Sequence, residues 1–239
     1  MLNPNLDTNE LATSYEIDNK YRVRNFMQND IAERMHNACK NNVKYSTHYV
    51  IDNLYQSKTP EEMAQLNPQQ ANDINVKISS AASQGIGFLY QGYLESRISK
   101  DPAVPIDNEL SFLHSVFKYM NSDEVIDNIK LITGNQDITG AELQYTRLTP
   151  GHFLTRHLDV VPSHDRRIAF VLGLTKGWHP DWGGLLQFYA KDGTPLDTWS
   201  PEFNVLTIFD VRHIHAVTYV TPYAAEPRLS LTGWFVAKG

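Results

Sequence analysis

The sequence contains little cysteine, no long apolar run and no excess of basic residues, and each of these absences excludes a class of protein. A single cysteine, Cys39, cannot form a disulfide within the chain and is typical of a reducing compartment. No stretch reaches the apolar length that spans a bilayer, and the polar, acidic N-terminus lacks the pattern of a signal peptide. These features predict a cytoplasmic protein without a membrane partner.

Positive charge is also scarce, because 21 Lys and Arg residues stand against 27 Asp and Glu residues, a formal net charge of −6. Proteins that bind nucleic acid neutralise phosphates with clustered Lys and Arg, so the acidic balance disfavours a nucleic-acid partner. Apolar residues, in contrast, are plentiful: 41% of the 239 residues are hydrophobic. That proportion is sufficient for a substantial packed core.

The composition changes along the chain and indicates its organisation. Residues 1–20 are rich in Asn, Asp, Thr and Glu and predict a flexible N-terminal arm. Residues 21–239 predict a single domain, with helical support mainly in 21–135 and a strand-rich core at about 140–237. The sequence has no internal repeat and no Pro/Ser-rich linker that would divide this domain.

Several segments before residue 135 carry helix signals. Apolar residues recur every three or four positions in 28–42 and in 108–120, as on the buried face of a helix. The residues Thr-Pro-Glu-Glu at 59–62 match a capping box with proline at the first helical position. A further helix is predicted from a Ser122 cap to a Gly134 stop.

After about residue 140, short runs rich in β-branched and aromatic residues alternate with turn-forming residues. This pattern is typical of antiparallel strands in a sandwich or barrel. Seven runs comprise residues 143–148, 153–160, 167–174, 185–190, 205–211, 213–220 and 229–236. The sequence therefore predicts an α+β fold in which a jelly-roll core, or double-stranded β-helix, is supported by N-terminal helices.

A histidine and an acid lie two residues apart in the second of these runs, TRHLDVV. On an extended chain His157 and Asp159 project from the same face, whereas Leu158 projects from the other. Alone, such a pair more often makes a surface hydrogen bond than binds a metal ion. Further ligands are needed before the pair indicates a metal site.

A pair of histidines, His213 and His215, is also spaced two apart, in the run VRHIHAVTYV. Two histidines and one carboxylate on one face of an octahedral ion leave the opposite positions open, as in non-haem Fe(II) oxygenases. A zinc ion could use the same ligands to polarise a water molecule. Periodicity allows either His213 or His215 to complete the site, and the number of ligands does not identify the metal.

The last strand-like run places an arginine and two hydroxyl groups on one side. Arg228, Ser230 and Thr232 alternate with leucines, so they share a face. Inside a barrel a guanidinium needs an anion, and its planar fork suits a carboxylate of a small diacid whose 2-oxo end chelates the metal. The alternative is an ion pair between Arg228 and a nearby surface acid such as Glu226.

Together, four motifs resemble the catalytic domain of 2-oxoglutarate/Fe(II)-dependent dioxygenases. They are PGHFLTRHLD, GWHPDWGGLLQFY, SPEFNVLTIFDVRHIHAVTYV and PRLSLTGWF. The similarity is closest to the prolyl-hydroxylase branch, which includes the Egl-nine oxygen sensors and the ribosomal-protein prolyl hydroxylases. It covers roughly residues 140–237, and GFLYQGY with the two predicted helices near 110–132 also looks family-like.

The resemblance implies a role for each matching position. His157, Asp159 and His215 would be the iron ligands, because the family places Val two residues after the ligand histidine, as in His-Ala-Val here. Arg228 would bind the distal carboxylate of 2-oxoglutarate, and Thr232 could add a hydroxyl contact. An acid at the second ligand position, and not Gly or Ala, argues against the related halogenases.

Other positions bear on the pocket. Trp234 matches an aromatic residue that lines the pocket in relatives. Arg167, together with Arg166 in the stretch SHDRR, is a candidate substrate contact. Some relatives hold the co-substrate with two tyrosines, and these places are occupied here by Leu148 and Gly173. The secondary contacts of the co-substrate are therefore expected to differ from those of such relatives.

The resemblance implies Fe(II), 2-oxoglutarate and dioxygen as cofactor and co-substrates, with ascorbate as reductant. Succinate and carbon dioxide would form while an unactivated C–H bond is hydroxylated, and a prolyl residue of a protein is the leading substrate. A free amino acid or another small molecule is the alternative substrate. A non-catalytic or zinc-binding cupin-like jelly-roll protein is the alternative of a different class. The segments 163–167 and about 68–105 are candidates to cover the mouth of the site.

Overall fold

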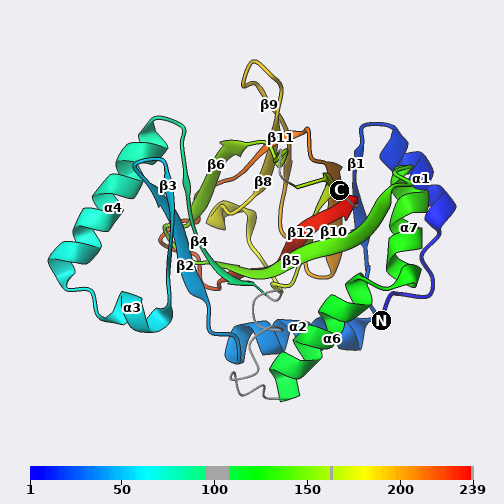
Figure 1. Ribbon diagram of the computed structural model, residues 1–239, viewed down its shortest axis with the longest axis horizontal. Coiled ribbons are helices and arrows are strands. Elements are labelled where there is room, and N and C mark those ends of the chain that lie inside the picture. Colours follow the sequence, from blue (N-terminus) through cyan, green and yellow to red (C-terminus); the bar gives the residue numbers. More distant parts are fainter. Residues whose placement is uncertain (95–107, 162–163, 238–239) are drawn as a thin grey trace.

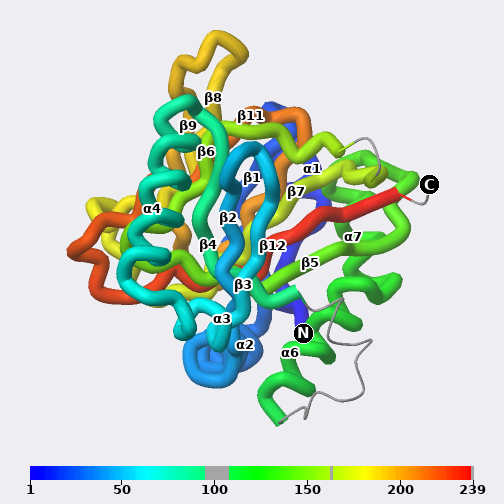
Figure 2. The backbone as a smooth tube through the Cα atoms, turned by 60° about the vertical axis from the view of Figure 1, so that its left-hand side comes forward, coloured from blue at the N-terminus to red at the C-terminus, as the bar shows by residue number. Residues whose placement is uncertain are grey.

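The computed structural model describes residues 1–94, 108–161 and 164–237 as a curled antiparallel sheet with helices on its flanks (Figure 1). The described part of the sheet has 12 strands. From residue 138 onward the strands divide between two runs that face each other. The hairpin between the strands at 186–189 and 195–199 projects beyond both runs (Figures 1 and 2).

The first run contains β5, β12, β7 and β10 in that order, with β1 beside β10. Its strands are β1 (Lys20–Arg24), β5 (Ile138–Leu148), β7 (Arg166–Gly173), β10 (Val205–Asp210) and β12 (Arg228–Ala237). The second run contains β6, β11, β8 and β9. Its strands are β6 (Phe153–His157), β8 (Leu186–Tyr189), β9 (Pro195–Trp199) and β11 (Ile214–Val217).

The chain passes repeatedly from one run to the other, which is the connectivity of a jelly roll. β4 (Phe88–Leu94) pairs with both β5 and β6 and so joins the two runs. A hairpin of β2 (Ser46–Ile51) and β3 (Leu54–Lys58) extends the sheet from β4. The predicted α+β fold with a jelly-roll core and helical support is confirmed.

The two faces of β12 explain where the core and the cavity lie. Leu229, Leu231 and Phe235 are buried on the face that packs against the helices. Arg228 and Thr232 project from the opposite face, into the space between the two runs. Because side chains alternate along a strand, one element serves both the hydrophobic core and the polar interior.

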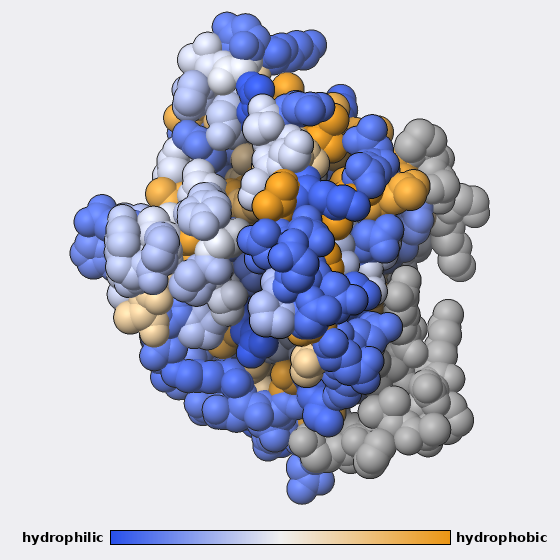
Figure 3. Space-filling view, turned by 90° about the vertical axis from the view of Figure 1, so that its left-hand side faces the viewer, coloured by the Kyte–Doolittle hydropathy of each residue, from blue (hydrophilic) through white to orange (hydrophobic). Residues whose placement is uncertain are grey.

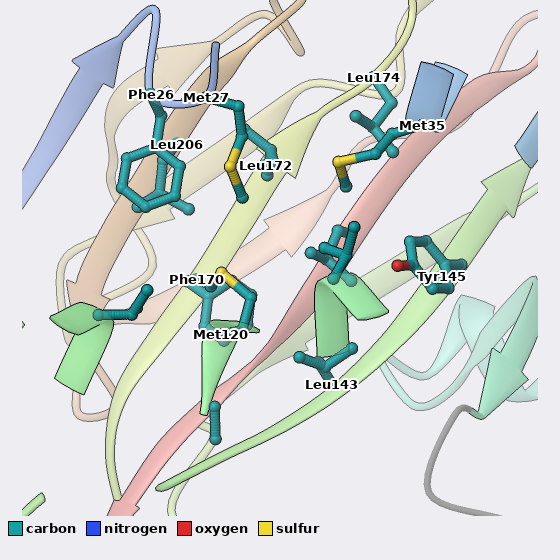
Figure 4. Packing of buried hydrophobic residues seen from close by; sticks show 14 of the residues in the cluster. Phe26, Met27, Met35, Met120, Leu143, Tyr145, Phe170, Leu172, Leu174 and Leu206 are labelled. Carbon is teal, nitrogen blue, oxygen red and sulfur yellow. The ribbon is translucent and has the colours of Figure 1, made fainter. Parts of the chain in front are cut away.

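Four helices cover the outer face of the first run. They are α1 (Thr8–Glu16), α2 (Asn29–Asn41), α6 (Asn108–Met120) and α7 (Asp123–Thr133). Met120 of α6 lies beside Phe170 of β7, and Met35 of α2 lies beside Leu174, directly after β7 (Figure 4). The apolar face predicted for residues 108–120 therefore packs against the sheet.

Two helices lie on the other flank, beside the β2–β3 hairpin and β4. They are α3 (Pro60–Ala64) and α4 (Pro68–Ser83), and the view of this side is mainly hydrophilic with scattered apolar residues (Figure 3). A short 3₁₀ helix, η1 (Pro180–Trp182), lies between β7 and β8. Among the described residues no helix is long and apolar enough to cross a membrane.

The N-terminal segment differs from the flexible arm that its composition predicts. Residues 8–16 form α1, whose N-terminus is capped by the Asp7 carboxylate, and Leu2 and Tyr15 are buried. The few apolar side chains of this segment lie on one side and pack against α7. The segment packs against α7 despite its low apolar content, because its apolar residues lie on a single face of α1.

Local helix signals were accurate in position. The capping box at Thr59 and Glu62 is present in both directions, and Gly134 ends α7 with φ of 73°. Ser122 occupies the N-cap position, but its side chain makes no capping hydrogen bond. The strand β9 was missed, because it begins with Pro195 directly after a turn and its side chains are largely exposed.

Gly134 permits a direct stability test of this fold. A Cβ at residue 134 would have no heavy atom within 4 Å, so its only cost is the left-handed backbone conformation. We expect Gly134→Ala to lower the free energy of unfolding by about 1 kcal/mol, measured by urea denaturation. Gly134→Asn should lose less, because asparagine tolerates this conformation better. Equal stability of Gly134→Ala and the wild type would contradict the assigned helix end.

Candidate metal and co-substrate site

A cavity of about 520 Å³ lies between the two runs of strands. Its walls come from the inner faces of β5, β7, β10 and β12 on one side and of β6, β8 and β11 on the other. Val50 of β2 and residues 85–88 before and within β4 complete the lining. Cavities of this size, mainly apolar with a few convergent polar groups, are typical of small-molecule sites.

Two histidines and one acid meet at this cavity. His157 of β6 and His215 of β11 are direct partners across the antiparallel pair, and their ring centroids lie 4.2 Å apart. Asp159, two residues beyond His157, places its carboxylate oxygens 3.7 Å from His157 Nε2 and 3.4 Å from His215 Nε2. One ligand atom from each of the three residues lies within 4.8 Å of the others.

The second ring nitrogen of each histidine has a backbone partner. His157 Nδ1 lies 2.8 Å from the Thr155 carbonyl oxygen, and His215 Nδ1 lies 3.0 Å from the His213 carbonyl oxygen. Because a carbonyl only accepts, each Nδ1 carries the hydrogen and donates it. Both Nε2 lone pairs are then available to a metal ion.

Burial favours the neutral form of His215. Desolvation, followed by the nearby His157 ring, lowers the pKa of His215 to about 4. A neutral imidazole is the form that coordinates a metal ion. The two imidazoles and one carboxylate are a donor set that suits Fe(II) and leaves part of the coordination sphere for other ligands.

Asp159 reaches this position although β6 ends at His157. Its backbone N–H donates to the Val211 carbonyl oxygen at 3.2 Å, which continues the alignment of the chain beyond the strand. Leu158 between the two ligands is 49% exposed and points away from the cavity. The alternation that the sequence predicts therefore persists past the end of the regular strand.

Arg228 is buried at the opposite part of the cavity wall without an acidic partner. Its side chain is 3% exposed, its Nε is buried and has no hydrogen-bond partner, and no carboxylate of the described residues forms an ion pair with it. Glu226 pairs with Lys40 at 2.8 Å instead. Burial lowers the pKa of Arg228 to about 10, and a bound anion would remove this penalty.

Further polar groups share the inner face of β12 and β5. Thr232 and Gln144 are register partners, and both line the cavity together with Thr146. Ser230 is fully buried, and its Oγ has no hydrogen-bond partner among the described residues. The Nε of Arg228 is likewise unpartnered, so this face of β12 offers two groups that can donate to a carboxylate, such as the far carboxylate of a 2-oxo diacid.

Sequence reasoning missed Gln144, Thr146 and Tyr90 as lining residues. Gln144 and Thr146 alternate along β5 just as Arg228 and Thr232 do along β12, so period-two spacing could have identified them. Tyr90 comes from β4 and shares a side-chain hydrogen bond with Gln144. No local pattern could place it, because β4 reaches the site only through long-range strand pairing.

At the two positions where some relatives carry tyrosine, this chain has Leu148 and Gly173. Leu148 lines the cavity as an apolar wall opposite Arg228 in the register. A Cβ at Gly173 would collide with the carbonyl oxygen of Glu202, in the connection after β9. A large side chain at residue 173 is therefore incompatible with the path of this connection.

The cavity is lined by Trp234 but by neither of the two arginines of the stretch SHDRR, Arg166 and Arg167. Trp234 lines the cavity, and the Arg166 guanidinium carbon lies 3.4 Å from its ring centroid. Arg167, the predicted substrate contact, does not line the cavity, and its guanidinium pairs with Asp137 at 2.8 Å. The structure thus brings Arg166, and not Arg167, next to the pocket aromatic.

The remaining candidates lie outside the cluster of ligands. His213 is not part of the cluster of His157, Asp159 and His215, and its ring contacts the Asp18 carbonyl oxygen. Of the segments predicted to cover the mouth, residues 85–88 line the cavity. Ser163 and residues 95–105 lie outside the described residues.

Comparison with known proteins agrees with this geometry. Residues 143–236 match the family model described as the 2OG-Fe(II) oxygenase superfamily. A prolyl 3-hydroxylase of Mus musculus, OGFOD1, is 35% identical over 89 residues, which are 32% of this chain and 16% of that protein. The match thus spans about one sixth of the curated relative.

Solved structures resemble nearly the whole chain. A prolyl-4-hydroxylase from Pseudomonas putida superposes with a TM-score of 0.62 and 20% identity, covering 98% of this chain and 100% of that one. A prolyl hydroxylase from Trichoplax adhaerens, solved with a hypoxia inducible factor peptide fragment, superposes with a TM-score of 0.62 and 16% identity. The match covers 96% of this chain and 89% of that one. These likenesses show the fold, and the family match over residues 143–236 confirms the predicted resemblance to prolyl-hydroxylase-like 2-oxoglutarate oxygenases.

Proposed function

We propose that this oxygenase hydroxylates a prolyl residue of a protein, using Fe(II), 2-oxoglutarate and dioxygen. The observation that carries the proposal is one cavity that contains both the His157, Asp159 and His215 cluster and the unpaired Arg228. A zinc or non-catalytic jelly-roll protein would have no use for the buried guanidinium. The arginine therefore favours a site for a metal ion and an anionic co-substrate together.

His157 Nε2, His215 Nε2 and the Asp159 carboxylate would hold Fe(II). With 2-oxoglutarate and dioxygen this ion supplies the oxidising power, and one oxygen atom enters succinate while the other enters the hydroxylated product, with release of carbon dioxide. Atoms and electrons balance, because oxidative decarboxylation of the 2-oxo acid provides two electrons and the substrate C–H bond provides two.

The residues of the chain bind and orient the reactants. Arg228 would bind the distal carboxylate of 2-oxoglutarate through its fork, and the unpartnered Ser230 Oγ lies on the same face of β12. Thr232 and Gln144 offer further hydrogen bonds along the cavity. The apolar wall that includes Leu148 limits access of water to the reacting atoms.

A prolyl substrate agrees with the apolar part of the cavity lining. Val50, Ile86 and Phe88 give an apolar lining that suits a pyrrolidine ring, and Trp234 adds an aromatic wall. The relatives named above are prolyl hydroxylases, one of them solved with a peptide. We place this chemistry in the cytoplasm, supported by the single, buried Cys39.

The test is co-substrate turnover followed by product identification. We expect the purified protein with Fe(II), ascorbate and 2-oxoglutarate to form succinate under air and none under nitrogen. Incubation with cell extract should add one oxygen atom to a proline-containing peptide, detected by mass spectrometry. Oxygen gain only on a free amino acid would contradict the protein substrate, and turnover that is independent of dioxygen would contradict the reaction.

A further inference from the structure

We infer that two backbone carbonyls from the N-terminal part of the chain, those of Asp18 and Gly87, orient the two metal-binding histidines through intermediate residues. The intermediates are His213 and Thr155, which act as positioning residues and not as ligands. We call the two contacts the Asp18 brace and the Gly87 brace. The inference rests on the proposed function in one respect: His157 and His215 are taken as metal ligands.

Both histidines depend on the carbonyl of the residue two positions earlier. His157 Nδ1 donates to Thr155 at 2.8 Å, and His215 Nδ1 donates to His213 at 3.0 Å. Such a hydrogen bond fixes both the tautomer and the ring plane of a metal-binding histidine. Whatever fixes Thr155 and His213 therefore fixes the direction of the two Nε2 lone pairs.

The Gly87 brace holds Thr155 twice. The Thr155 N–H and the Thr155 hydroxyl both donate to the Gly87 carbonyl oxygen, at 3.0 Å and 2.8 Å. Gly87 has φ of +114°, a backbone conformation that residues other than glycine rarely adopt. The glycine thus turns its carbonyl toward β6 immediately before β4 begins.

The Asp18 brace holds His213 through its ring. His213 Nε2 lies 3.0 Å from the Asp18 carbonyl oxygen, so this nitrogen carries the hydrogen and donates it. The His213 N–H donates to the Asp210 carbonyl at 3.0 Å, and the Asp210 N–H donates to the Asn19 carbonyl at 2.9 Å. The turn between β10 and β11 is therefore tied at both ends to residues 18–19.

The surroundings of the Asp18 brace are tightly packed. The buried Lys20 ammonium forms ion pairs with Asp18 and, at 3.0 Å, with Asp197. The fully buried Phe188 ring lies 5.7 Å from the His213 ring and 6.3 Å from the His215 ring. These contacts limit the movement of residue 213 and of the carbonyl that it presents.

The two braces come from outside the family match at residues 143–236. Asp18 and Gly87 lie 195 and 68 positions before His213 and Thr155, and β1 and β4 bring them to the site. Periodicity made His213 an alternative ligand, but we infer that it is a positioning residue. Its ring is held by the Asp18 carbonyl, and its own carbonyl accepts the hydrogen bond that orients the His215 ring.

Binding of Mn(II) alone tests the inference without turnover. Mn(II) binds nitrogen and oxygen sites weakly enough for changes in affinity to be measured, and free Mn(II) is quantified by electron paramagnetic resonance. We expect His213→Ala to raise the dissociation constant about 10- to 100-fold. Thr155→Val should raise it about fivefold, because the backbone donor remains. His213→Gln keeps an N–H donor and should restore wild-type affinity.

Matched controls separate positioning from general destabilisation. His36→Ala removes a ring hydrogen bond to the Leu174 carbonyl, and Thr133→Val removes a hydroxyl bond to the Ile129 carbonyl, both away from the cavity. Both should bind Mn(II) as the wild type does. If His213→Ala and Thr155→Val match these controls, the braces are refuted. A wild type that fails to bind Mn(II) would instead contradict the proposed function. If His213→Ala does not fold by circular dichroism, Thr155→Val and His213→Gln decide.

Discussion

Asp159→Ala should abolish succinate formation from 2-oxoglutarate and Fe(II), with a loss of more than about 100-fold, beyond the range typical of residues outside the ligand set. The carboxylate lies within 3.7 Å of both Nε2 atoms, so its removal deletes one of three ligands and the anionic charge that offsets the cation. Succinate released per enzyme, measured under air by mass spectrometry, reports the loss.

An exposed acid provides the control for this variant. Asp181, whose side chain is 79% exposed, lies outside the cavity lining, and Asp181→Ala should retain wild-type turnover. Metal binding should follow the same order, with Mn(II) affinity lost in Asp159→Ala and kept in Asp181→Ala. Full turnover by Asp159→Ala would mean that the three grouped side chains are not the ligand set.

Arg228→Met should have opposite effects on co-substrate binding and on the stability of the free protein. Loss of a buried hydrogen-bonded charge pair costs about 2–5 kcal/mol, so the 2-oxoglutarate requirement should rise at least about 30-fold. In the free protein the same change removes a buried cation that has no acidic partner. Urea denaturation should therefore show a free energy of unfolding higher by about 1 kcal/mol or more.

Arg34 is the matched arginine for this comparison. It is partly exposed and pairs with Glu109 at 3.1 Å on the helical side of the molecule. Arg34→Met should leave the 2-oxoglutarate requirement unchanged and should not stabilise the protein. A stability loss in Arg228→Met with unaltered 2-oxoglutarate dependence would show that the guanidinium supports the fold and does not bind the co-substrate.

Local patterns were sufficient for the parts of the site that lie on single strands. Alternation along β12 placed Arg228 and Thr232 on the cavity face, and the spacing of His157 and Asp159 put both at the metal cluster. The helix stop at Gly134 also follows from local chemistry. In each case the feature depends on residues a few positions apart, either strand alternation or the glycine at a helix end. It can therefore be predicted from the local sequence.

A register irregularity explains why Arg166, and not Arg167, lies beside Trp234. Phe235 pairs with Ile168, whereas the next residue, Val236, pairs with Arg166, so β7 contains an extra residue at this point. Such a bulge reverses which side chain faces the cavity. No sequence pattern indicates the bulge. In a regular strand Val236 would pair with Arg167, and Arg167 would lie on the same side as Trp234.

Long-range pairing explains what else the sequence could not supply. Tyr90 and Gly87 reach the site because β4 joins the two runs, and Asp18 reaches it because β1 pairs with β10. His213 lies outside the cluster of His157, Asp159 and His215, and its ring instead donates to the Asp18 carbonyl oxygen, 195 positions earlier. These facts depend on contacts between segments that are at least 50 residues apart in the sequence.

The most direct test of the account is a crystal structure of the protein with Mn(II) and 2-oxoglutarate. We predict one metal ion bound by His157 Nε2, His215 Nε2 and the Asp159 carboxylate, with the far carboxylate of the diacid on the Arg228 guanidinium. A metal ion bound elsewhere, or a diacid whose far carboxylate does not touch Arg228, would contradict the central claim that one cavity binds both.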